Sequence, residues 1–578
     1  MKQNLKQTAR KRLAAMALFL LICLPFSLAQ AQTIKVNGRV TDDLNEPMIG
    51  VSIVEKGTAN GCITDIDGNY TLNVKQGATL VYSYIGYVAL ERKAVAGVMN
   101  IILKEDAQAL DEVVVVGYGV QKKSSVTGAI SQVKSEDIQN RSITRAEEAL
   151  QGKTAGVQLV STTSQPGSSP TIRIRGFSSN GTSDPLYVVD GLIVNDLSSI
   201  DPNNIKSMEV LKDAASAAIY GAQAGNGVVL ITTKSGSQGT SSISYDFQYS
   251  INSLARRPEL LNSQEYLTQM KEADPTFTDV NIRELISNGV WDGVSSTDWY
   301  DVAFNASPAS RHTVTFQGAN DKGSYFLSLN NLYDNGIIRE DRDTYKRLSV
   351  MLNADYKIKP WLKVGTTANY ANYTSKAISD GSGGTSYVSM IATVMTLAPY
   401  IADTYPADAL PTQMQAQIAN GFTLLQNANG DYYSCLGTME QVHPMVAIRM
   451  NDKKNTGNSL MGTLYANFTP IKDLVFTTRL GYRIATDNTY THNNLYYGSA
   501  SASNKDRNGV TRTSLSTTYY QWENFVNYNT TLLDTHNISA MLGMSYSQSD
   551  QIYVSAGVDK IAKDNLLYAD VDWPAGDA

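Results

Sequence analysis

The stretch RLSVMLNADYKIKPWLKVGTTANY, from Arg347 to Tyr370, sets the pattern for the larger half of the chain. Apolar and polar residues alternate on both sides of the short interruption Lys359-Pro360-Trp361. A period of two is typical of a β-strand, and proline is typical of a tight turn. The stretch therefore predicts a hairpin with one apolar and one polar face. Its apolar face carries Leu348, Val350, Leu352, Ala354, Tyr356, Ile358, Leu362, Val364, Thr366, Ala368 and Tyr370.

The same alternation recurs in two other parts of the chain. It begins at residues 242–251, and it returns in a second hairpin, residues 460–482, which turns at 470–473. Strands of about ten residues with apolar-out, polar-in alternation are the signature of outer-membrane β-barrels. A soluble β-sandwich with an aromatic core is the alternative. Long amphipathic strands with lysine and arginine on the polar face argue against it.

The connections between these strands predict two different rims. Short turns suit the periplasmic side of a barrel, whereas the long polar connections Thr374–Asn458 and Ile484–Thr513 suit the extracellular side. Of the 33 tyrosines, 26 fall in residues 240–578, often near strand ends, as aromatic girdles at the two membrane interfaces require.

The N-terminus predicts export from the cytoplasm. The only long apolar run, Leu13–Ala29, follows five basic residues and ends near the small residues Ala29 and Ala31. These features describe a cleavable signal peptide over residues 1–31. Cys23 follows Ile22 rather than a small residue, which disfavours a lipoprotein signal.

Composition and charge exclude several classes of protein. With 578 residues, 42% hydrophobic content and 18% charged content, a disordered or collagen-like polymer is excluded. A mean hydropathy of −0.22 excludes a bundle of membrane-spanning helices. Removal of the signal segment changes the net charge from −6 to −11, which argues against nucleic acid as a partner.

Motifs for catalysis or metal binding are missing from the sequence. Cys62 and Cys435 are the two cysteines left after cleavage, the four histidines are scattered, and no H-E-x-x-H, P-loop or G-x-S-x-G motif occurs. Residues 65–69 (DIDGN) lack the spacing of a calcium loop and predict an Asp-Gly hairpin turn. We expect no cofactor and no metal, and a secreted hydrolase is disfavoured.

Residues 32–105 predict a small β-sandwich. The stretches 38–42 (GRVTD), 47–51, 56–58 and 64–70 resemble the carboxypeptidase regulatory-like domain. The resemblance implies a non-catalytic, seven-strand transthyretin-like sandwich. The expected strands are Ile34–Val40, Gly50–Lys56, Asn69–Val74, Thr79–Tyr84 and Met99–Leu103.

A linker over residues 106–119 contains four consecutive valines behind two acidic residues. Four β-branched residues favour an extended strand over a helix. One interpretation is a further buried strand. The other is an accessible strand that pairs with the sheet edge of a partner, whose backbone would supply the hydrogen bonds.

Residues 120–236 predict a compact mixed domain. Thr144 and Glu147 have the spacing of a capping box that opens a helix through Leu150, which Gly152 ends. The strands expected after it are 171–177, 185–190, 207–211 and 228–233, with an Ala-rich helix from Asp213 to Gly221.

Several stretches of this domain resemble, in collinear order, the plug of the SusC/RagA-type TonB-dependent outer-membrane transporters. The resemblance implies a plug at 120–236 inside a barrel at 240–578, and periplasmic placement of the sandwich. It makes the valine segment a TonB box, the partner-binding residues being Asp111, Glu112, Val113, Val114, Val115, Val116, Gly117 and Tyr118. The stretches that carry it are 149–152 (ALQG), 172–176 (IRIRG), 185–191 (PLYVVDG), 201–205, 209–214 (EVLKDA), 218–221 (AIYG) and 225–234.

The strand count predicts an incomplete barrel. About ten candidate strands fall in residues 240–578, whereas a barrel wide enough for such a plug has 22, which at this spacing needs roughly 750 residues. The polar end, residues 571–578, is unlike the aromatic-ended last strand of such barrels. A premature stop, a split gene and a fragmentary gene model all remain open.

The resemblance implies active import of oligosaccharides or peptides, together with TonB and a SusD-like surface lipoprotein, by a protein that is not an enzyme. A surface signalling or adhesion receptor without transport is the alternative. The substrate cannot be read from the sequence. Tyr432 and Tyr433 are candidates for stacking on sugars, and a role in the aromatic girdle or in loop packing is the alternative.

Overall fold

The computed structural model describes residues 33–42, 46–58, 60–84, 87, 89–104, 113–116, 119–122, 130–139, 141, 143–161, 163, 165–177, 183–236, 241–378, 390–436, 441–532 and 536–561. The expected signal peptide and the polar chain end lie outside these residues. The chain divides into two compact units, residues 1–114 with 121–126 and residues 115–120 with 127–578. Among the described residues, no helix has the length and apolar character needed to cross a membrane.

The first unit contains the predicted β-sandwich. One sheet has the order β4-β1-β7, with β8 also paired to β1, and the other has the order β3-β2-β5-β6. Eight strands are present, where the resemblance implies seven and the alternation predicts five. The alternation misses β3, β6 and β7, because each of them has only two to four residues. Val36, Ile53, Leu80 and Tyr82 are fully buried between the sheets. The strands are β1 (Thr33–Thr41), β2 (Ser52–Glu55), β3 (Gly61–Ile63), β4 (Asn69–Lys75), β5 (Thr79–Ser83), β6 (Leu90–Lys93), β7 (Gly97–Val98) and β8 (Ile101–Ile102).

The predicted Asp-Gly turn joins β3 to β4, but it is not the predicted hairpin turn, because β3 and β4 belong to different sheets. One carboxylate oxygen of Asp65 accepts the backbone N–H groups of Asp67 and Asn69 at 3.0 and 2.7 Å. Gly68 has a φ of 77°, which is the left-handed conformation that glycine adopts without strain. The acidic residues of this loop therefore serve the turn.

The second unit begins with the plug, which we define as residues 130–236. Its main sheet has the order β11-β16-β17-β14-β15, and β12 and β13 form a separate hairpin. Ile205, Met208, Val210 and Val229 are fully buried in its core. The elements are β11 (Ile130–Lys134), α2 (Ser135–Gln139), η2 (Ala146–Leu150), β12 (Val157–Val160), β13 (Thr171–Ile174), β14 (Leu186–Val189), β15 (Leu192–Val194), η3 (Pro202–Asn204), β16 (Ile205–Leu211), α3 (Ala214–Ala217), η4 (Ala218–Ala224) and β17 (Val228–Thr233).

The predicted capping box at Thr144 is wrong. Residues 146–150 form a 3₁₀ helix whose N-cap is Arg145, without a side-chain cap. The carboxylate of Glu147 binds the Arg145 guanidinium at 2.6 Å instead, and both side chains are buried. The Glu147 carboxylate therefore pairs with the Arg145 guanidinium and does not cap the helix.

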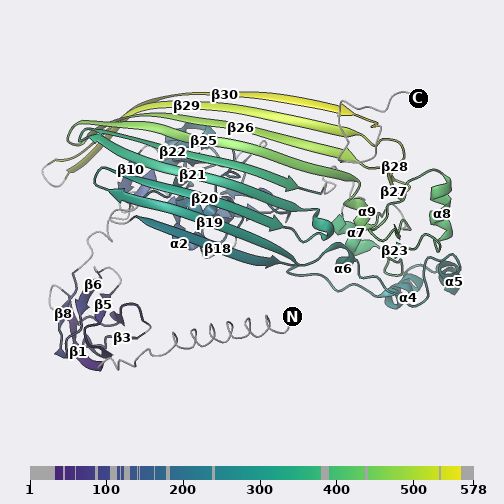
Figure 1. Cartoon of the computed structure of the whole chain (residues 1–578), viewed down its shortest axis with the longest axis horizontal. Helices are drawn as coiled ribbons and strands as arrows, with labels where there is room; N and C mark the ends of the chain where they lie inside the picture. The colour runs from purple at the N-terminus through teal and green to yellow at the C-terminus, as the bar shows by residue number, and fades with distance from the viewer. Residues whose placement is uncertain are drawn as a thin grey trace, which may run out of the picture. The chain divides into compact units, whose positions relative to one another are not determined.

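The rest of the second unit is built on one antiparallel sheet of nine strands, which we call the wall. Strands adjacent in sequence lie side by side, and the plug elements lie against one face of the sheet (Figure 1). The sheet is not closed within the described residues, and its edges are β18 and β30. This confirms a partial antiparallel barrel, with nine strands against about ten expected. They are β18 (Ser242–Asn252), β19 (Ser307–Asn320), β20 (Gly323–Asn335), β21 (Thr344–Lys359), β22 (Leu362–Lys376), β25 (Asn451–Ile471), β26 (Leu474–Asn493), β29 (Val510–Leu532) and β30 (His536–Val558).

The two ends of the wall differ, as the connections predict. Short hairpin turns gather at one end and the helices at the other (Figure 1). The strands run further than expected: β22 continues to Lys376 and β25 begins at Asn451, because alternation disappears where both faces are polar. The elements of the helical end are α4 (Ser263–Ala273), α5 (Asp279–Ser287), α6 (Trp299–Ala303), η5 (Arg339–Asp341), α7 (Met390–Thr396), β23 (Thr404–Tyr405), α8 (Thr412–Ala419), β24 (Tyr432–Tyr433), α9 (Pro444–Ala447), β27 (Tyr496–Ser499) and β28 (Ala502–Asn504).

The helices of this end share a hydrophobic core of their own. Trp299, Val394, Met414 and Val446 are among its fully buried members. The sequence did not predict this layer, because its helices are mostly one to three turns long and show little periodicity.

Candidate functional site

The surface between plug and wall is the candidate functional site. Alternation gives each wall strand an inner face, which contacts the plug, and an outer face. Inner positions carry polar side chains such as Arg347, Asn369 and Gln521, whereas outer positions carry exposed apolar residues such as Leu348 and Tyr370. Since the polar face meets the plug, many contacts between the two parts are hydrogen bonds, and they surround apolar contacts such as that of Met461 with the plug core.

A buried ion pair lies in the middle of this surface. Arg347 of β21 donates from Nη2 to Oδ2 of Asp201 at 2.7 Å, and from Nη1 to the carbonyl oxygen of Ser198 at 3.0 Å. The other carboxylate oxygen of Asp201 accepts the N–H of Asn203 and caps η3. The plug carboxylate is therefore held by its own helix on one side and by the wall on the other.

Two further wall strands, β22 and β25, contact the plug at Ser199. Asn369 of β22 donates to the Ser199 carbonyl oxygen at 2.8 Å, and the Ser199 hydroxyl lies 3.7 Å from the sulfur of Met461 on β25. Three plug residues within one stretch of four, Ser198, Ser199 and Asp201, thus contact three different wall strands through separate groups.

A second contact surrounds the plug turn at Gly191. The side-chain amide of Gln521 donates to the Gly191 carbonyl at 2.9 Å and accepts the Ile193 N–H at 3.1 Å. Gly191 has a φ of 86°, and a Cβ there would collide with the Arg479 guanidinium, which pairs with Glu523 at 2.6 Å. Glycine is therefore required at this turn by both backbone conformation and wall contact.

A third contact lies at the start of the 3₁₀ helix. The Thr144 hydroxyl donates to Oδ2 of Asp334 at 3.1 Å, and the Arg311 guanidinium donates to the Ile143 carbonyl. Gln165 exchanges two hydrogen bonds with the backbone of Ile378. The plug is therefore bound to the wall at points far apart in sequence.

Burial affects the protonation of an acidic residue at this surface. Desolvation raises the pKa of the plug residue Asp190, and hydrogen bonds from the hydroxyl and N–H of Thr233 oppose the rise. Through these two hydrogen bonds the carboxyl group joins Thr233 of β17 to the turn at Asp190 and Gly191.

The packing leaves little space between the two parts. The gap lined by Val189, Leu192, Met351 and Met461 measures about 20 Å³. This is room for about one water molecule and for nothing larger. A solute therefore cannot pass along this part of the wall unless the plug moves.

The predicted TonB box is described only in part. Val113–Val116 form the strand β9, which pairs with β10 (Gly119–Lys122). Asp111, Glu112, Gly117 and Tyr118 lie outside the described residues. The strand conformation agrees with the valine pattern, and the partner-binding role stays a prediction.

Among the remaining candidate residues are Tyr433 and the two cysteines, and their neighbours are side chains of the protein itself. Tyr433 is buried, its ring lies 5.2 Å from that of His443, and its hydroxyl donates to Glu340 at 3.2 Å. These contacts favour loop packing over sugar stacking for this residue. Cys62 and Cys435 are both free, and no cluster of three or more His, Cys, Asp or Glu residues suited to a metal occurs among the described residues.

Sequence reasoning missed the residues that join plug and wall. Arg347 lies on the predicted polar face, where nothing distinguishes it from a side chain in water. Asp201, in an Asp-Pro-Asn turn, carries a recognisable helix-cap signal but no sign of its second partner. The pair is separated by 146 residues, so only the fold brings it together.

The comparisons with known proteins agree with this architecture. Residues 122–228 match the TonB-dependent receptor plug domain, and residues 36–115 match the CarboxypepD_reg-like domain. The chain is 34% identical to the TonB-dependent receptor SusC of Bacteroides thetaiotaomicron, over 81% of this chain and 47% of the relative. It is 30% identical to the TonB-dependent receptor P26 of Formosa agariphila, over 89% and 49%.

A solved structure gives the same fold. The RagAB peptide importer in its open-open state superposes with a TM-score of 0.65 at 23% identity, over 79% of this chain and 52% of that one. The chain spans about half the length of the curated relatives it matches. These relatives are named TonB-dependent receptors, and the chain contains the plug domain and the CarboxypepD_reg-like domain and is similar to the SusC-type receptors over about half of their length.

Proposed function

We propose that the protein takes part in TonB-dependent import of oligosaccharides or peptides across the outer membrane. TonB would bind residues 111–118, and a SusD-like lipoprotein would cover the helical end of the wall. The whole transporter is the unit of this activity, and the described wall supplies nine of its strands.

The observation that carries the proposal is the kind of contact between plug and wall. A plug needed only to close a pore is best held by apolar packing, because apolar burial is the dominant favourable term in folding. Here hydrogen bonds and a buried ion pair add to the apolar contacts, and each of them must be broken for the plug to move. A pull on the segment ahead of the plug would supply that work.

Deletion of residues 111–118 tests the proposal. Uptake of labelled oligosaccharides and peptides by cells that produce the protein should fall to the level of cells without it. Insertion in the outer membrane, followed by heat-modifiable migration on gels, should be unchanged. A variant in which residues 106–109 are replaced by four serines serves as a control for linker changes outside the box. Unchanged uptake after the deletion would refute the assignment, and ligand binding with no uptake even in the unaltered protein would favour a signalling receptor.

A further inference from the structure

The outer face of the wall carries a groove that the import proposal does not use. It measures about 570 Å³ and is formed by two neighbouring rows of outward residues across β21, β22, β25 and β26. One row is Ala354, Thr366, Leu464 and Leu480, and the other is Tyr356, Val364, Ala466 and Thr478.

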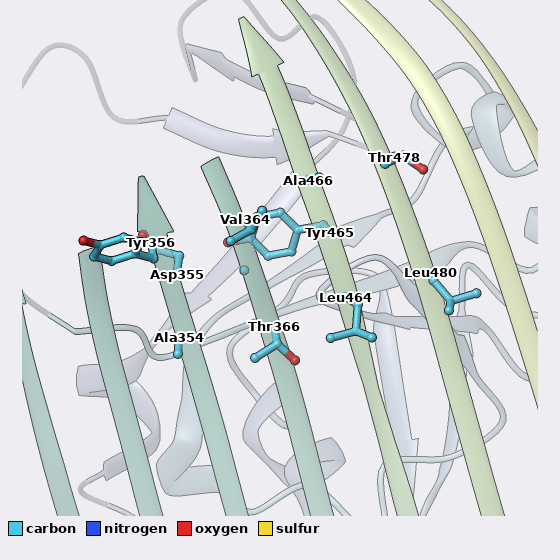
Figure 2. A pocket seen from close by; sticks show the side chains of 11 residues that line it. Ala354, Asp355, Tyr356, Val364, Thr366, Leu464, Tyr465, Ala466, Thr478 and Leu480 are labelled. Carbon is cyan, nitrogen blue, oxygen red and sulfur yellow. The ribbon is translucent and has the colours of Figure 1, made fainter. Parts of the chain in front are cut away.

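Small side chains create the hollow. Ala354 and Thr366 are neighbours in one row, and Ala466 and Thr478 are neighbours in the other. The larger Tyr356, Leu464 and Leu480 also line the hollow (Figure 2). Tyr356, Leu464 and Leu480 are 51%, 51% and 42% exposed. The residues that alternate with this set include Met461 and Arg479, which contact the plug, so the groove faces away from the plug.

The position of the groove in the membrane follows from the register. Below it, toward the short turns, Trp361, Phe468 and Phe476 form a row of aromatic rings with centroids 6.4 and 6.0 Å apart. Above it, the outward residues become polar at Asn372 and Asn458, whose side chains are hydrogen-bonded at 2.8 Å.

The ten residues from Phe468 to Asn458 span about 34 Å along the strand, or about 25 Å along the membrane normal at the usual tilt of about 40–45°. This equals the usual apolar band of outer-membrane barrels. Ala466 and Leu464 lie two and four residues above the aromatic row, so the groove lies within the half of the band next to the periplasmic turns.

The charge at the adjacent rim indicates the occupant. Lys359 and Lys472 are exposed at the two turns below the aromatic row, and neither has an ion pair within the part of the chain that the structure describes. Lys363, by contrast, pairs with Asp355 at 3.1 Å. An apolar hollow inside the bilayer with two free ammonium groups at its mouth is complementary to one acyl chain and the phosphate of a phospholipid.

We propose that this groove binds a phospholipid of the periplasmic leaflet, with one acyl chain over Ala466 and Thr478 and the headgroup phosphate near Lys359 and Lys472. Its volume lies within the range of small-molecule sites, about 300–1,000 Å³. The site is independent of the import function and of the plug.

Native mass spectrometry of the full protein, released from outer membranes in mild detergent, tests the site. The unaltered protein should retain phospholipid. The double variant Ala466→Leu, Thr478→Leu fills the hollow and should retain about tenfold less, the factor expected from losing roughly two buried methylene contacts. The control Thr518→Leu repeats the threonine-to-leucine change at an outward position level with Ile484, outside the groove, and should retain as much as the unaltered protein.

A second variant keeps the proposal testable if the filled groove impairs folding. Lys359→Gln with Lys472→Gln changes exposed turn positions only. It should lower retention of anionic phospholipid, and the retention that is left should depend less on salt, because the screened attraction has been removed. Equal retention by the filled variant and the control would overturn the proposal. A dimer mass that is lost in the filled variant, without any bound lipid, would overturn it as well and would assign the groove to a second copy of the chain.

Discussion

Arg347 of the wall and Asp201 of the plug form an ion pair of 2.7 Å in which the side chains are 1% and 0% exposed. A buried pair of this kind adds little net stability over an apolar pair, yet loss of one partner leaves the other charge buried and uncompensated. The interface is therefore stable when intact and strongly destabilised once the pair separates. That property suits a plug that must be held firmly and also released.

Separate and combined substitutions at this pair should show strong coupling. Arg347→Met and Asp201→Asn should each lower the free energy of plug release by about 3–5 kcal/mol, because each leaves one unpaired buried group. The double variant should cost clearly less than the sum of the two. Limited proteolysis of the plug across a urea series measures these values, and additive costs would show that the two side chains do not interact.

Gly191→Ala should weaken the hold of the wall on the plug. Alanine is strained at this position, because the backbone φ is 86°. The added Cβ also collides with the Arg479 guanidinium and displaces it from its place beside Glu523. We expect a loss of about 1–3 kcal/mol in the same urea series. Gly152→Ala is a matched control, because Gly152 also has a positive φ, of 72°, but nothing lies within 4 Å of its Cβ position. Equal losses in both variants would exclude a steric role for Arg479.

The loop that joins β20 to β21 should open more easily as pH rises. Burial raises the pKa of Asp343 to about 7, and the nearby Asp334 and Asp341 add to the rise. Between about pH 4 and pH 7 the closed loop keeps this proton while the open loop loses it, so closure weakens over that interval and levels off above it. Hydrogen exchange of residues 336–343 should show a decrease on the order of 1–3 kcal/mol in opening free energy.

The variant Asp343→Asn should remove this pH dependence, since the amide keeps the acceptor for the Ile338 N–H and carries no charge. Asp408→Asn, at an exposed position in another loop, should leave it unchanged. A slope that persists in Asp343→Asn would assign the effect to another group.

The wall was predictable because its physical cause is local. Each strand between the turns must present apolar groups to lipid and polar groups to the plug, so alternation is written into residues 347–370 and 460–482. The ends of the strands were less predictable. Beyond Tyr373, for example, both faces are polar, and β22 continues to Lys376 without a pattern to show it.

The plug contacts and the helical end were not predictable for a different reason. Asp201 and Arg347 meet through the tertiary fold, and the interaction leaves no trace in the sequence around either residue. The capping box is a similar case, because Thr144 and Glu147 have the right spacing but other partners. Glu147 pairs with Arg145, the Thr144 N–H is bonded to Glu148, and the Thr144 hydroxyl is bonded to Asp334 of the wall.

A reversible covalent link between plug and wall tests the central claim most directly. Ser199→Cys with Met461→Cys, in a background with Cys62 and Cys435 changed to serine, places two cysteines at positions whose native side chains are in contact, next to the buried ion pair. Formation of the link is verified by a shift in gel migration that a reductant reverses. Oxidation of this variant should stop uptake of labelled oligosaccharide or peptide, and a reductant should restore it, whereas Ser199→Cys alone should transport under both conditions. Full uptake by the oxidised, cross-linked protein would contradict the account, since it would show that a solute passes while the plug remains attached to the wall.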